Sequence, residues 1–316
     1  MKPASDFDLI ILGGGIAGMT AAIFAARANL KTVIVEQHAC GGLANWTNTV
    51  ENFPSRISIN GMELMELVLA QVENLGVEVD QAAEVERLDI AGVVKTVETG
   101  EYLYRGKAII LATGRQPITL NVDTDSDRIH YCSVCDGSAY AGKKVLVVGG
   151  GNSGFDESLY LLSLGVKEIV MVEFLERCCA AESTQAKLSG HPNVSIHCFT
   201  AVKAIAKEGK GCRVTLVDRA TDEERSLYVD GVFVFIGQKA NTQLLRGLVE
   251  LDAYGYIPVG PNQETNVPGV YAAGDVVQKN YRYLTTAMAD GTIAALAAEK
   301  YIRELRATEA TTTGAR

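Results

Sequence analysis

The sequence has less positive than negative charge and no long apolar run. Its 29 Lys and Arg residues are outnumbered by 38 Asp and Glu residues, which gives a formal net charge of −9. Because a phosphate-backbone partner requires clustered cations, this balance argues against nucleic-acid binding. No apolar run approaches the ~20 residues that span a bilayer, and residues 1–8 lack a basic stretch followed by an apolar signal core. We therefore expect a cytoplasmic protein that binds neither nucleic acid nor a membrane.

Recognisable metal-ligand patterns are also scarce. The four histidines show no ligand spacing, and the seven cysteines, an odd number, do not describe a secreted disulfide framework. We expect Cys40, Cys198 and Cys212 to be reduced residues that pack as small hydrophobes. Only Cys132 and Cys135 have a diagnostic spacing, CxxC.

Proline and tryptophan are rare, with 7 and 1 residues, whereas glycine is abundant, with 31. Together with 47% hydrophobic residues, this composition is typical of an α/β protein with many tight strand-to-helix turns. The 316 residues exceed the usual span of one hydrophobic core, so we expect two compact units.

Two glycine-rich turns each follow an apolar run and precede a helical pattern. GGGIAG follows the apolar residues 8–12 and leads to KTVIVE, which ends at Glu36; GGGNSG follows residues 144–148 and leads to EIVMVE, which ends at Glu173. Each is a βαβ unit with a GxGxxG fingerprint. The fold class that we predict is α/β with two Rossmann-like dinucleotide-binding domains.

The glycines of a fingerprint make the tight bend, the close approach to a pyrophosphate and the close packing of helix on strand, and the carboxylate accepts bonds from a ribose diol. A 2′-phosphate would meet the charge of Glu173, with only Arg177 nearby. We therefore expect NAD(H) or a second FAD at the second fingerprint, and not NADPH; an empty, vestigial fold is the alternative. The candidate residues are Gly13, Gly15, Gly18 and Glu36, and then Gly149, Gly151, Gly154 and Glu173.

Two further strand-like segments, residues 107–117 and 230–242, mark crossings between domains. After them come a buried strand within residues 266–277 and a long helix over about 285–306, without a fingerprint of their own. We expect this last part to complete the first domain. The predicted organisation is a discontinuous FAD-binding domain, 1–118 and 244–316, and a second dinucleotide-binding-like domain, 119–243, which carries the CxxC.

The CxxC spacing lets two sulfurs close a small ring, and a lowered thiolate pKa makes one of them a nucleophile. A zinc half-site is the main rival, and a merely structural pair is another. No second CxxC or HxxxH completes a zinc site, and Cys178 and Cys179 could be recruited only by long-range folding. His130 lies two residues before Cys132 and could tune that thiol if it folds toward it, although a surface or turn role is more usual.

Several motifs occur in an order that resembles the low-molecular-weight thioredoxin reductase family over nearly the whole chain. They are GGGIAGMTAA, CGGLANWTNTVENFP, ATGRQP, CSVCDG, GGGNSG, and VYAAGDVV running into YRYLTTAMADG. The resemblance implies a homodimer with FAD at the first fingerprint, facing the cysteine pair. It implies that Cys135 is next to the flavin, that Cys132 attacks a partner disulfide and that Asp136 donates or accepts a proton. The flavin-side positions would be Gly42, Asn52, Gly114, Gly274, Asp275, Arg282 and Tyr283.

The chain also departs from that family. It reads VEFLERCCAAE where the family has a basic cluster for the 2′-phosphate of NADPH, Tyr283 stands in place of a Gln, and Leu43 replaces another polar flavin contact. The function that we expect is an FAD-dependent disulfide oxidoreductase whose partner is a thioredoxin-like or small disulfide. Its donor would be a second flavin, a ferredoxin-like protein or NADH. The alternative is a non-catalytic flavoprotein redox sensor.

Overall fold

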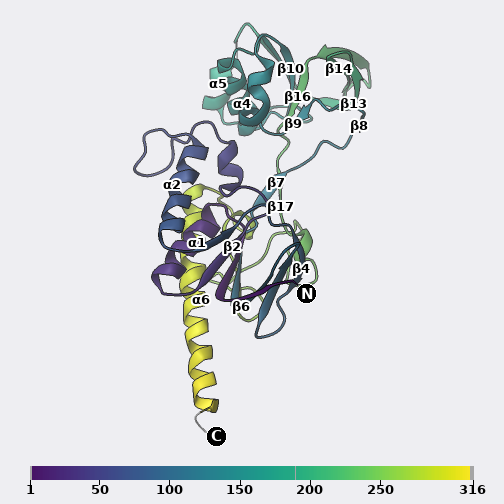
Figure 1. The fold of residues 1–316 in the computed structure, drawn as a ribbon. Helices are drawn as coiled ribbons and strands as arrows, with labels where there is room; N and C mark the ends of the chain where they lie inside the picture. Colours follow the sequence, from purple (N-terminus) through teal and green to yellow (C-terminus); the bar gives the residue numbers. More distant parts are fainter. Residues whose placement is uncertain (1, 189, 314–316) are drawn as a thin grey trace. The chain divides into compact units, whose positions relative to one another are not determined.

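The computed structural model describes residues 2–188 and 190–313, without the side chains of 310–313. The chain divides into two compact units, the first formed by Met1–Gln116 with Lys239–Arg316 and the second by Pro117–Gln238 (Figure 1). The chain crosses between them in β7 (Arg115–Pro117) and β17 (Gln238–Ala240), which pair as a two-stranded sheet. Both divisions lie a few residues before the positions expected from the sequence, because each falls within this pair of strands.

The first unit is built on a seven-stranded sheet in the order β3-β2-β1-β6-β5-β4, with β18 pairing the second half of β6. The central strands β3, β2, β1, β6 and β18 are parallel, whereas β4 and β5 form an antiparallel hairpin on β6. The parallel strands read as continuous apolar runs because both of their faces are covered. The bounds are β1 Ala4–Leu12, β2 Thr32–Val35, β3 Glu78–Asp80, β4 Val85–Asp89, β5 Lys95–Thr99, β6 Leu103–Leu111 and β18 Val270–Ala272.

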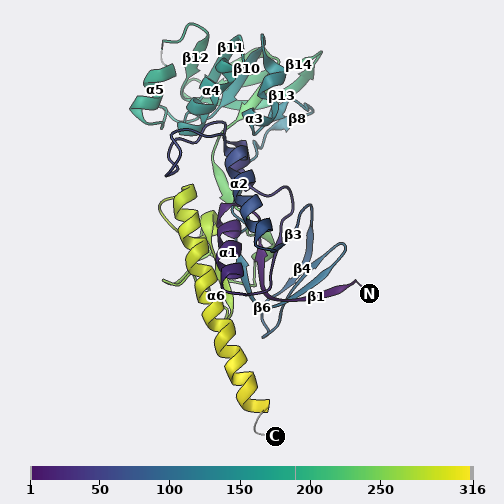
Figure 2. The ribbon, with the colours of Figure 1, turned by 60° about the vertical axis from the view of Figure 1, so that its left-hand side comes forward.

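Three helices of the first unit, α1 (Ile16–Arg27), α2 (Gly61–Asn74) and α6 (Leu284–Thr313), lie together on one side of this sheet (Figures 1 and 2). Alanines on α1 and α6 pack into one buried cluster with aliphatic residues of the sheet. Short side chains let helices approach closely, which is why these segments are Ala-rich. Asn60 begins α2 by accepting hydrogen bonds from the next turn.

Helix α6 is longer than the predicted 285–306, because it continues to Thr313. Two ion pairs fix this last part to the sheet: Arg306 with Asp8, at 2.5 Å, and Lys107 with Glu309, at 3.0 Å. The sequence of the helix end is mostly polar and does not show which distant residues it contacts, so these ion pairs were not predicted.

The second unit has a parallel sheet in the order β12-β11-β10-β16-β9 and a second sheet in the order β15-β14-β13-β8. Helices α4 (Asn152–Ser163) and α5 (Glu182–Leu188) contribute to the core on one face of the parallel sheet, and the second sheet packs on the other face. The bounds are β8 Asp123–Thr124, β9 Ile129–His130, β10 Lys144–Val148, β11 Glu168–Val172, β12 Val194–His197, β13 Thr200–Glu208, β14 Gly211–Asp218, β15 Glu224–Val229 and β16 Gly231–Val234.

Short helical segments complete the fold: α3 (Ser133–Asp136) and the 3₁₀ turns η1 (Gly42–Trp46), η2 (Gly137–Tyr140), η3 (Gln243–Leu245) and η4 (Gly274–Val276). Both units have the α/β arrangement that the sequence predicts. Across residues 2–188 and 190–313, none of the helices has the length and apolar character that crossing a membrane demands.

Candidate active site

The first fingerprint forms a tight turn between β1 and α1. Gly13 has φ +106°, and a Cβ there would lie 2.3 Å from the Ala112 carbonyl oxygen. A Cβ on Gly18 would lie 1.9 Å from the Gly13 oxygen, so helix and turn touch at this point. By contrast, a Cβ on Gly15 would meet nothing within 4 Å. The turn is therefore closed behind Gly13 and Gly18 and open at Gly15, as a pyrophosphate site requires.

Glu36 ends the βαβ unit beside this turn. One carboxylate oxygen accepts a hydrogen bond from the Gly14 N–H at 2.6 Å, and the other accepts one from the His38 N–H at 2.8 Å. Because each carboxylate oxygen has a second lone pair, Glu36 can still accept hydrogen bonds from ribose hydroxyls. Gly15 begins α1 without a side-chain cap, and the first turn of α1 has no acidic residue. The N–H groups of this helix end thus suit phosphate oxygens.

The segment after Glu36 closes onto the turn. Gly41 pairs with Gly15 in an isolated parallel bridge, and a Cβ on Gly42 would lie 3.5 Å from the Gly15 Cα. Asn45 donates to the Cys40 carbonyl at 2.8 Å, while its own Oδ1 is buried and accepts no hydrogen bond from the described residues. An orphaned buried acceptor beside an open turn fits a site built for a bound group.

Gly114 and Asn52, the other two predicted flavin-side residues before the GD segment, differ in where the structure places them. Gly114 has φ +65° with open space at its Cβ position, and its carbonyl accepts from the Asn241 N–H at 3.0 Å. Asn52 is exposed, and no contact of the described residues joins it to the fingerprint turn. Gly42 and Gly15 are therefore brought together, whereas Asn52 is not.

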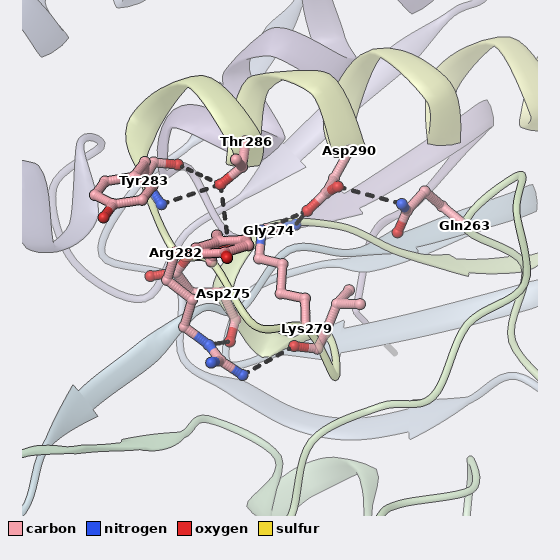
Figure 3. A network of polar contacts seen from close by, with 10 residues as sticks. Gln263, Gly274, Asp275, Lys279, Arg282, Tyr283, Thr286 and Asp290 are labelled. Atoms are coloured by element: carbon pink, nitrogen blue, oxygen red, sulfur yellow. Dashed lines mark hydrogen bonds and ion pairs between the residues drawn. The ribbon is translucent and has the colours of Figure 1, made fainter. Parts of the chain in front are cut away.

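The GD segment lies against the start of α1. Gly274 has φ +82°, a Cβ there would lie 2.7 Å from the Ala17 Cβ, and its N–H donates to the Asp290 carboxylate at 3.1 Å (Figure 3). Asp290 also pairs with Lys279 at 2.6 Å. Burial raises the pKa of Asp275, and Lys279, 3.9 Å away, opposes that shift.

Arg282 and Tyr283 precede α6. Arg282 donates to the carbonyl oxygens of Asp275, at 3.5 Å, and Val277, at 3.2 Å, and its guanidinium lies 4.2 Å from the Tyr256 ring centroid. Arg282 therefore holds the Asp275 segment in shape (Figure 3). Tyr283 is exposed, and its backbone is engaged at the helix start: its N–H donates to the Thr286 hydroxyl, and its carbonyl accepts from that hydroxyl and from the Ala287 N–H, each at 3.0 Å.

The glycines of the second fingerprint have the same conformation and the same surroundings as those of the first. Gly149 has φ +115°, with the Phe235 carbonyl oxygen 2.3 Å from its Cβ position. A Cβ on Gly154 would lie 2.0 Å from the Gly149 oxygen, and one on Gly151 would meet nothing within 4 Å. The turn therefore retains the open position that a pyrophosphate needs.

Glu173 occupies the place that Glu36 has in the first unit. Its carboxylate accepts from the Gly150 N–H at 2.5 Å and from the Leu175 N–H at 2.9 Å, and the side chain is buried. A negative charge is thus fixed where the adenosine ribose of a dinucleotide would lie.

The cations near this carboxylate are not arranged for a phosphate. Arg177 is exposed on the segment after β11. The Arg219 guanidinium stacks on the Phe174 ring, 3.6 Å from its centroid, lies 4.8 Å from the Phe199 ring centroid, and donates to the Phe174 carbonyl. Arg219 therefore braces this segment by contacts with its own chain.

Cys132 and Cys135 are joined by a disulfide, with their Cα atoms 5.4 Å apart. Cys132 begins α3, and its sulfur accepts a hydrogen bond from the Cys135 N–H at 3.0 Å. Cys132 is buried, whereas Cys135 is exposed. In the described part of the chain, no three His, Cys, Asp or Glu side chains gather as metal ligands.

A chain of polar side chains leads away from the dithiol. His130 Nδ1 lies 3.1 Å from the Asp136 carboxylate, and His130 Nε2 lies 2.6 Å from the Tyr140 hydroxyl. Arg128 in turn hydrogen-bonds Tyr140, although burial has the larger effect and raises the pKa of the phenol. Both ring nitrogens of His130 are thus engaged, Nδ1 by the Asp136 carboxylate and Nε2 by the Tyr140 hydroxyl, which fixes the orientation of the ring. His130 therefore does fold toward the CxxC helix.

Glu157 of α4 forms a second contact with this helix. Ser133 lies between the two cysteines in the sequence, and its side chain is fully buried. Its hydroxyl donates to the Glu157 carboxylate. Burial raises the pKa of Glu157 to about 7, and the nearby charge of Asp156 adds to the shift.

Comparison with known proteins places this geometry in a family. Residues 7–291 match the model of the pyridine nucleotide-disulphide oxidoreductase family. The chain belongs to this family. It is 39% identical over 306 residues to the 34.2 kDa protein in the rubredoxin operon of Clostridium pasteurianum, covering 96% of this chain and 99% of that protein. It is 36% identical over 313 residues to the thioredoxin reductase of Bacillus subtilis, covering 98% of each. The structure of Lactococcus lactis thioredoxin reductase, in the FR conformation, superposes with a TM-score of 0.88 at 31% identity, over 94% of this chain and 99% of that one.

The predicted resemblance to low-molecular-weight thioredoxin reductases, the Rossmann-like fold class and the enzyme class are therefore confirmed. The chain is a thioredoxin reductase-like, flavin-dependent disulfide oxidoreductase. FAD is the flavin that this family binds.

Sequence reasoning missed several residues of this thioredoxin reductase-like chain. Lys279 and Asp290 support the GD segment, Glu157 contacts the CxxC helix, and Arg219 braces the segment after Glu173. Asp290 lies within the YRYLTTAMADG motif but was not singled out, and the other three lie outside the quoted motifs, because each acts through a contact with a residue that is not adjacent in sequence.

Proposed function

We propose that FAD binds at the first fingerprint, that two electrons pass between it and the Cys132–Cys135 pair, and that the dithiol reduces a thioredoxin-like or small disulfide. We further propose that NADPH is not the electron donor. The observation that carries the second part is the Glu173 carboxylate, buried and bonded to the second fingerprint turn.

FAD fits the residues of the first unit. The open position at Gly15, the uncapped start of α1 and the carboxylate of Glu36 match the pyrophosphate and ribose of the cofactor. The orphaned Oδ1 of Asn45 supplies a further acceptor near the turn. When bound, the flavin would supply the two electrons that reduce the Cys132–Cys135 bond.

The chain's own residues carry the disulfide chemistry. Reduction of the Cys132–Cys135 bond takes up two electrons and yields two thiols, and a thiolate of the pair then attacks the partner disulfide. We assign the taking and returning of the proton to Asp136, on the family resemblance, and its carboxylate is held by His130. We retain Cys132 as the attacking sulfur and Cys135 as the flavin-side sulfur, on the family resemblance.

The second fingerprint is proposed to hold a dinucleotide with an unphosphorylated ribose, either NAD(H) or a second FAD. Two like charges about 4 Å apart repel by roughly 4 kcal/mol at an effective dielectric of ~20. This repulsion disfavours a 2′-phosphate beside Glu173, and Arg219 is held by Phe174. The donor would then be NADH, a second flavin or a ferredoxin-like protein. We also propose a homodimer, for which sedimentation should give twice the 33.8 kDa of the chain.

Anaerobic mixing with NADPH and with NADH, followed at the flavin absorbance band, tests this proposal. NADPH should reduce the flavin slowly or not at all, and fast reduction at micromolar NADPH would refute the donor assignment. The ratio of extracted FAD to protein shows whether the second site holds NAD(H) or a second FAD. Gly151→Leu should remove a second FAD and leave the first, while Gly15→Leu should remove the first.

Turnover distinguishes the enzyme from the redox sensor. With a low-potential reductant in excess, an oxidoreductase reduces many equivalents of a small disulfide per chain, whereas a sensor stops after one. Cys132→Ser should abolish turnover and leave Cys135 free to give a long-wavelength charge-transfer band with the flavin. Turnover that survives this substitution would exclude the pair as the site.

A further inference from the structure

Three of the five free cysteines lie together in the second unit. Cys178 and Cys179 follow β11, and Cys198 directly follows the neighbouring strand β12. The sulfurs of Cys178 and Cys198 are 3.6 Å apart. Because Val172 and His197 are opposite each other in the sheet, the two chain segments leave adjacent strands at the same edge.

Backbone hydrogen bonds hold both segments in place. The Cys179 N–H donates to the Gly150 carbonyl at 2.9 Å, and the Phe199 N–H donates to the Leu175 carbonyl at 2.8 Å. The sulfur of Cys178 also lies against the fingerprint turn, since a Cβ on Gly150 would be 2.7 Å from it. The short distance between the sulfurs is therefore a property of the packed sheet edge.

The two thiols are close enough to bond. A disulfide requires sulfurs about 2.05 Å apart, so closure needs a movement of roughly 1.5 Å, which a small side-chain rotation provides. The other two free cysteines, Cys40 and Cys212, are buried in separate hydrophobic clusters.

The thiols differ in how they can react. Burial raises the pKa of Cys178 well above its ordinary value, so Cys178 is a poor first nucleophile. Cys198 has a half-buried side chain, which a small disulfide can reach more readily than a folded protein can. Cys179 is exposed, but the sulfur that Cys178 approaches is that of Cys198.

We propose that Cys178 and Cys198 form a second redox couple, distinct from Cys132–Cys135, that exchanges with low-molecular-weight disulfides. The Cys198 thiolate attacks a disulfide RSSR, forming a mixed disulfide and releasing RS⁻. Cys178 then loses its proton and attacks the Cys198 sulfur, and the second RS⁻ leaves. Two protein thiols are oxidised, one small disulfide is reduced to two thiols, and a dithiol reverses the reaction. The new bond would tie the segment after β11 to the start of β13, beside the second fingerprint.

Thiol counting on the full-length holoprotein tests the couple. Protein in which Cys132 and Cys135 are already bonded should show five thiols on denaturation, and three after incubation with excess oxidised glutathione. Alkylation, digestion and mass spectrometry should find a peptide pair joined through Cys178 and Cys198, and dithiothreitol should restore all five thiols. A count that stays at five, or a persistent glutathione adduct on Cys198, would overturn the proposal.

Matched variants keep the test independent of folding defects. Cys179→Ser should still lose two thiols on oxidation, whereas Cys178→Ser and Cys198→Ser should form less than one tenth as much cross-linked product as the parent. A cross-link that disappears in Cys179→Ser and persists in Cys178→Ser would show that Cys179, and not Cys178, is the partner of Cys198, and would contradict the proposal. The Cys132→Ser/Cys135→Ser variant keeps the same five thiols and should behave like the parent, which separates this couple from the proposed catalytic pair.

Discussion

Single residues around the CxxC decide how protons are handled there. Asp136 is bonded to His130, and His130 is bonded to Tyr140, so the three side chains act as one unit. Glu157 stands apart from this network and contacts the same short helix through Ser133.

His130→Gln should slow disulfide exchange about tenfold, because Asp136 loses the ring that positions it for proton transfer. The rate at which dithionite-reduced protein reduces an aromatic disulfide, measured from about pH 6 to about pH 9, should also change its pH dependence. Tyr140→Phe removes only the hydroxyl at Nε2 and should have a smaller effect in the same direction. Equal rates and an unchanged pH profile in His130→Gln would show that the ring is merely packing.

Glu157→Gln should stabilise the protein at alkaline pH. Burial raises the pKa of Glu157 from 4.5 to about 7, so the folded state binds this proton more tightly than the unfolded state does. The contribution to the unfolding free energy is complete below about pH 4.5 and is lost as the pH rises through 7. Because Gln does not ionise, Glu157→Gln should avoid this loss. The unfolding free energy should therefore rise by at most about 3 kcal/mol near pH 8 and change little near pH 4.

Urea unfolding at both pH values measures the difference. Glu223→Gln, at an exposed position in the same unit, is the control and should change little at either pH. A Glu157→Gln protein that is less stable than the parent at pH 8 would mean that the Ser133 contact requires the charge.

At the scale of elements, the strand–turn–helix unit shows how one glycine differs from the next. The first and third glycines of each fingerprint meet backbone oxygens, while the second faces open space. The same arrangement in both units indicates that the turn itself, and not the surrounding fold, dictates these positions.

Gly15→Leu should therefore keep the fold and lose FAD, whereas Gly18→Ala should damage the fold. A Leu side chain at Gly15 enters the open space that the pyrophosphate needs. An Ala at Gly18 places its Cβ 1.9 Å from the Gly13 oxygen, and we expect a loss of about 2–3 kcal/mol. Circular dichroism, urea unfolding and flavin absorbance separate the two outcomes; a Gly15→Leu protein with full FAD content would place the flavin elsewhere.

The whole molecule consists of two units with separate hydrophobic cores. One pair of clusters belongs to the first unit and the other pair to the second, so no core residue is shared. The second unit is one continuous segment, and the strands at its two ends, β7 and β17, are paired. The chain can therefore be closed across this pair by a short linker.

Replacing Pro117–Gln238 by a short Gly/Ser linker should leave a first unit that folds and binds FAD. Extracted flavin should remain near one per chain, and the excised segment should show a cooperative unfolding transition by itself. Gly15→Leu in the shortened chain is the control and should be colourless. An insoluble or flavin-free product would mean that the first unit needs the second to form its site.

The sequence by itself determined the features whose parts lie close together along the chain. The fingerprint turns, the carboxylates Glu36 and Glu173, and the Cys132–Cys135 ring are such features, because local backbone geometry sets where neighbouring residues point. Seven parallel strands were also visible as apolar runs, namely β1, β2, β6, β10, β11, β16 and β18. By contrast, the short parallel strands β3, β9 and β12, the antiparallel strands β13 to β15 and helix α2 were not predicted from the pattern.

Only the tertiary structure decided the contacts between distant segments. It brings Cys178 to Cys198 because β11 and β12 are neighbours in the sheet, and it brings Asp290 of α6 to Gly274 because the helix crosses the GD turn. It also continues α6 beyond its predicted end at residue 306, where Glu309 pairs with Lys107 of the sheet. Such contacts depend on which elements pack side by side, and the spacing of residues along a chain does not record this.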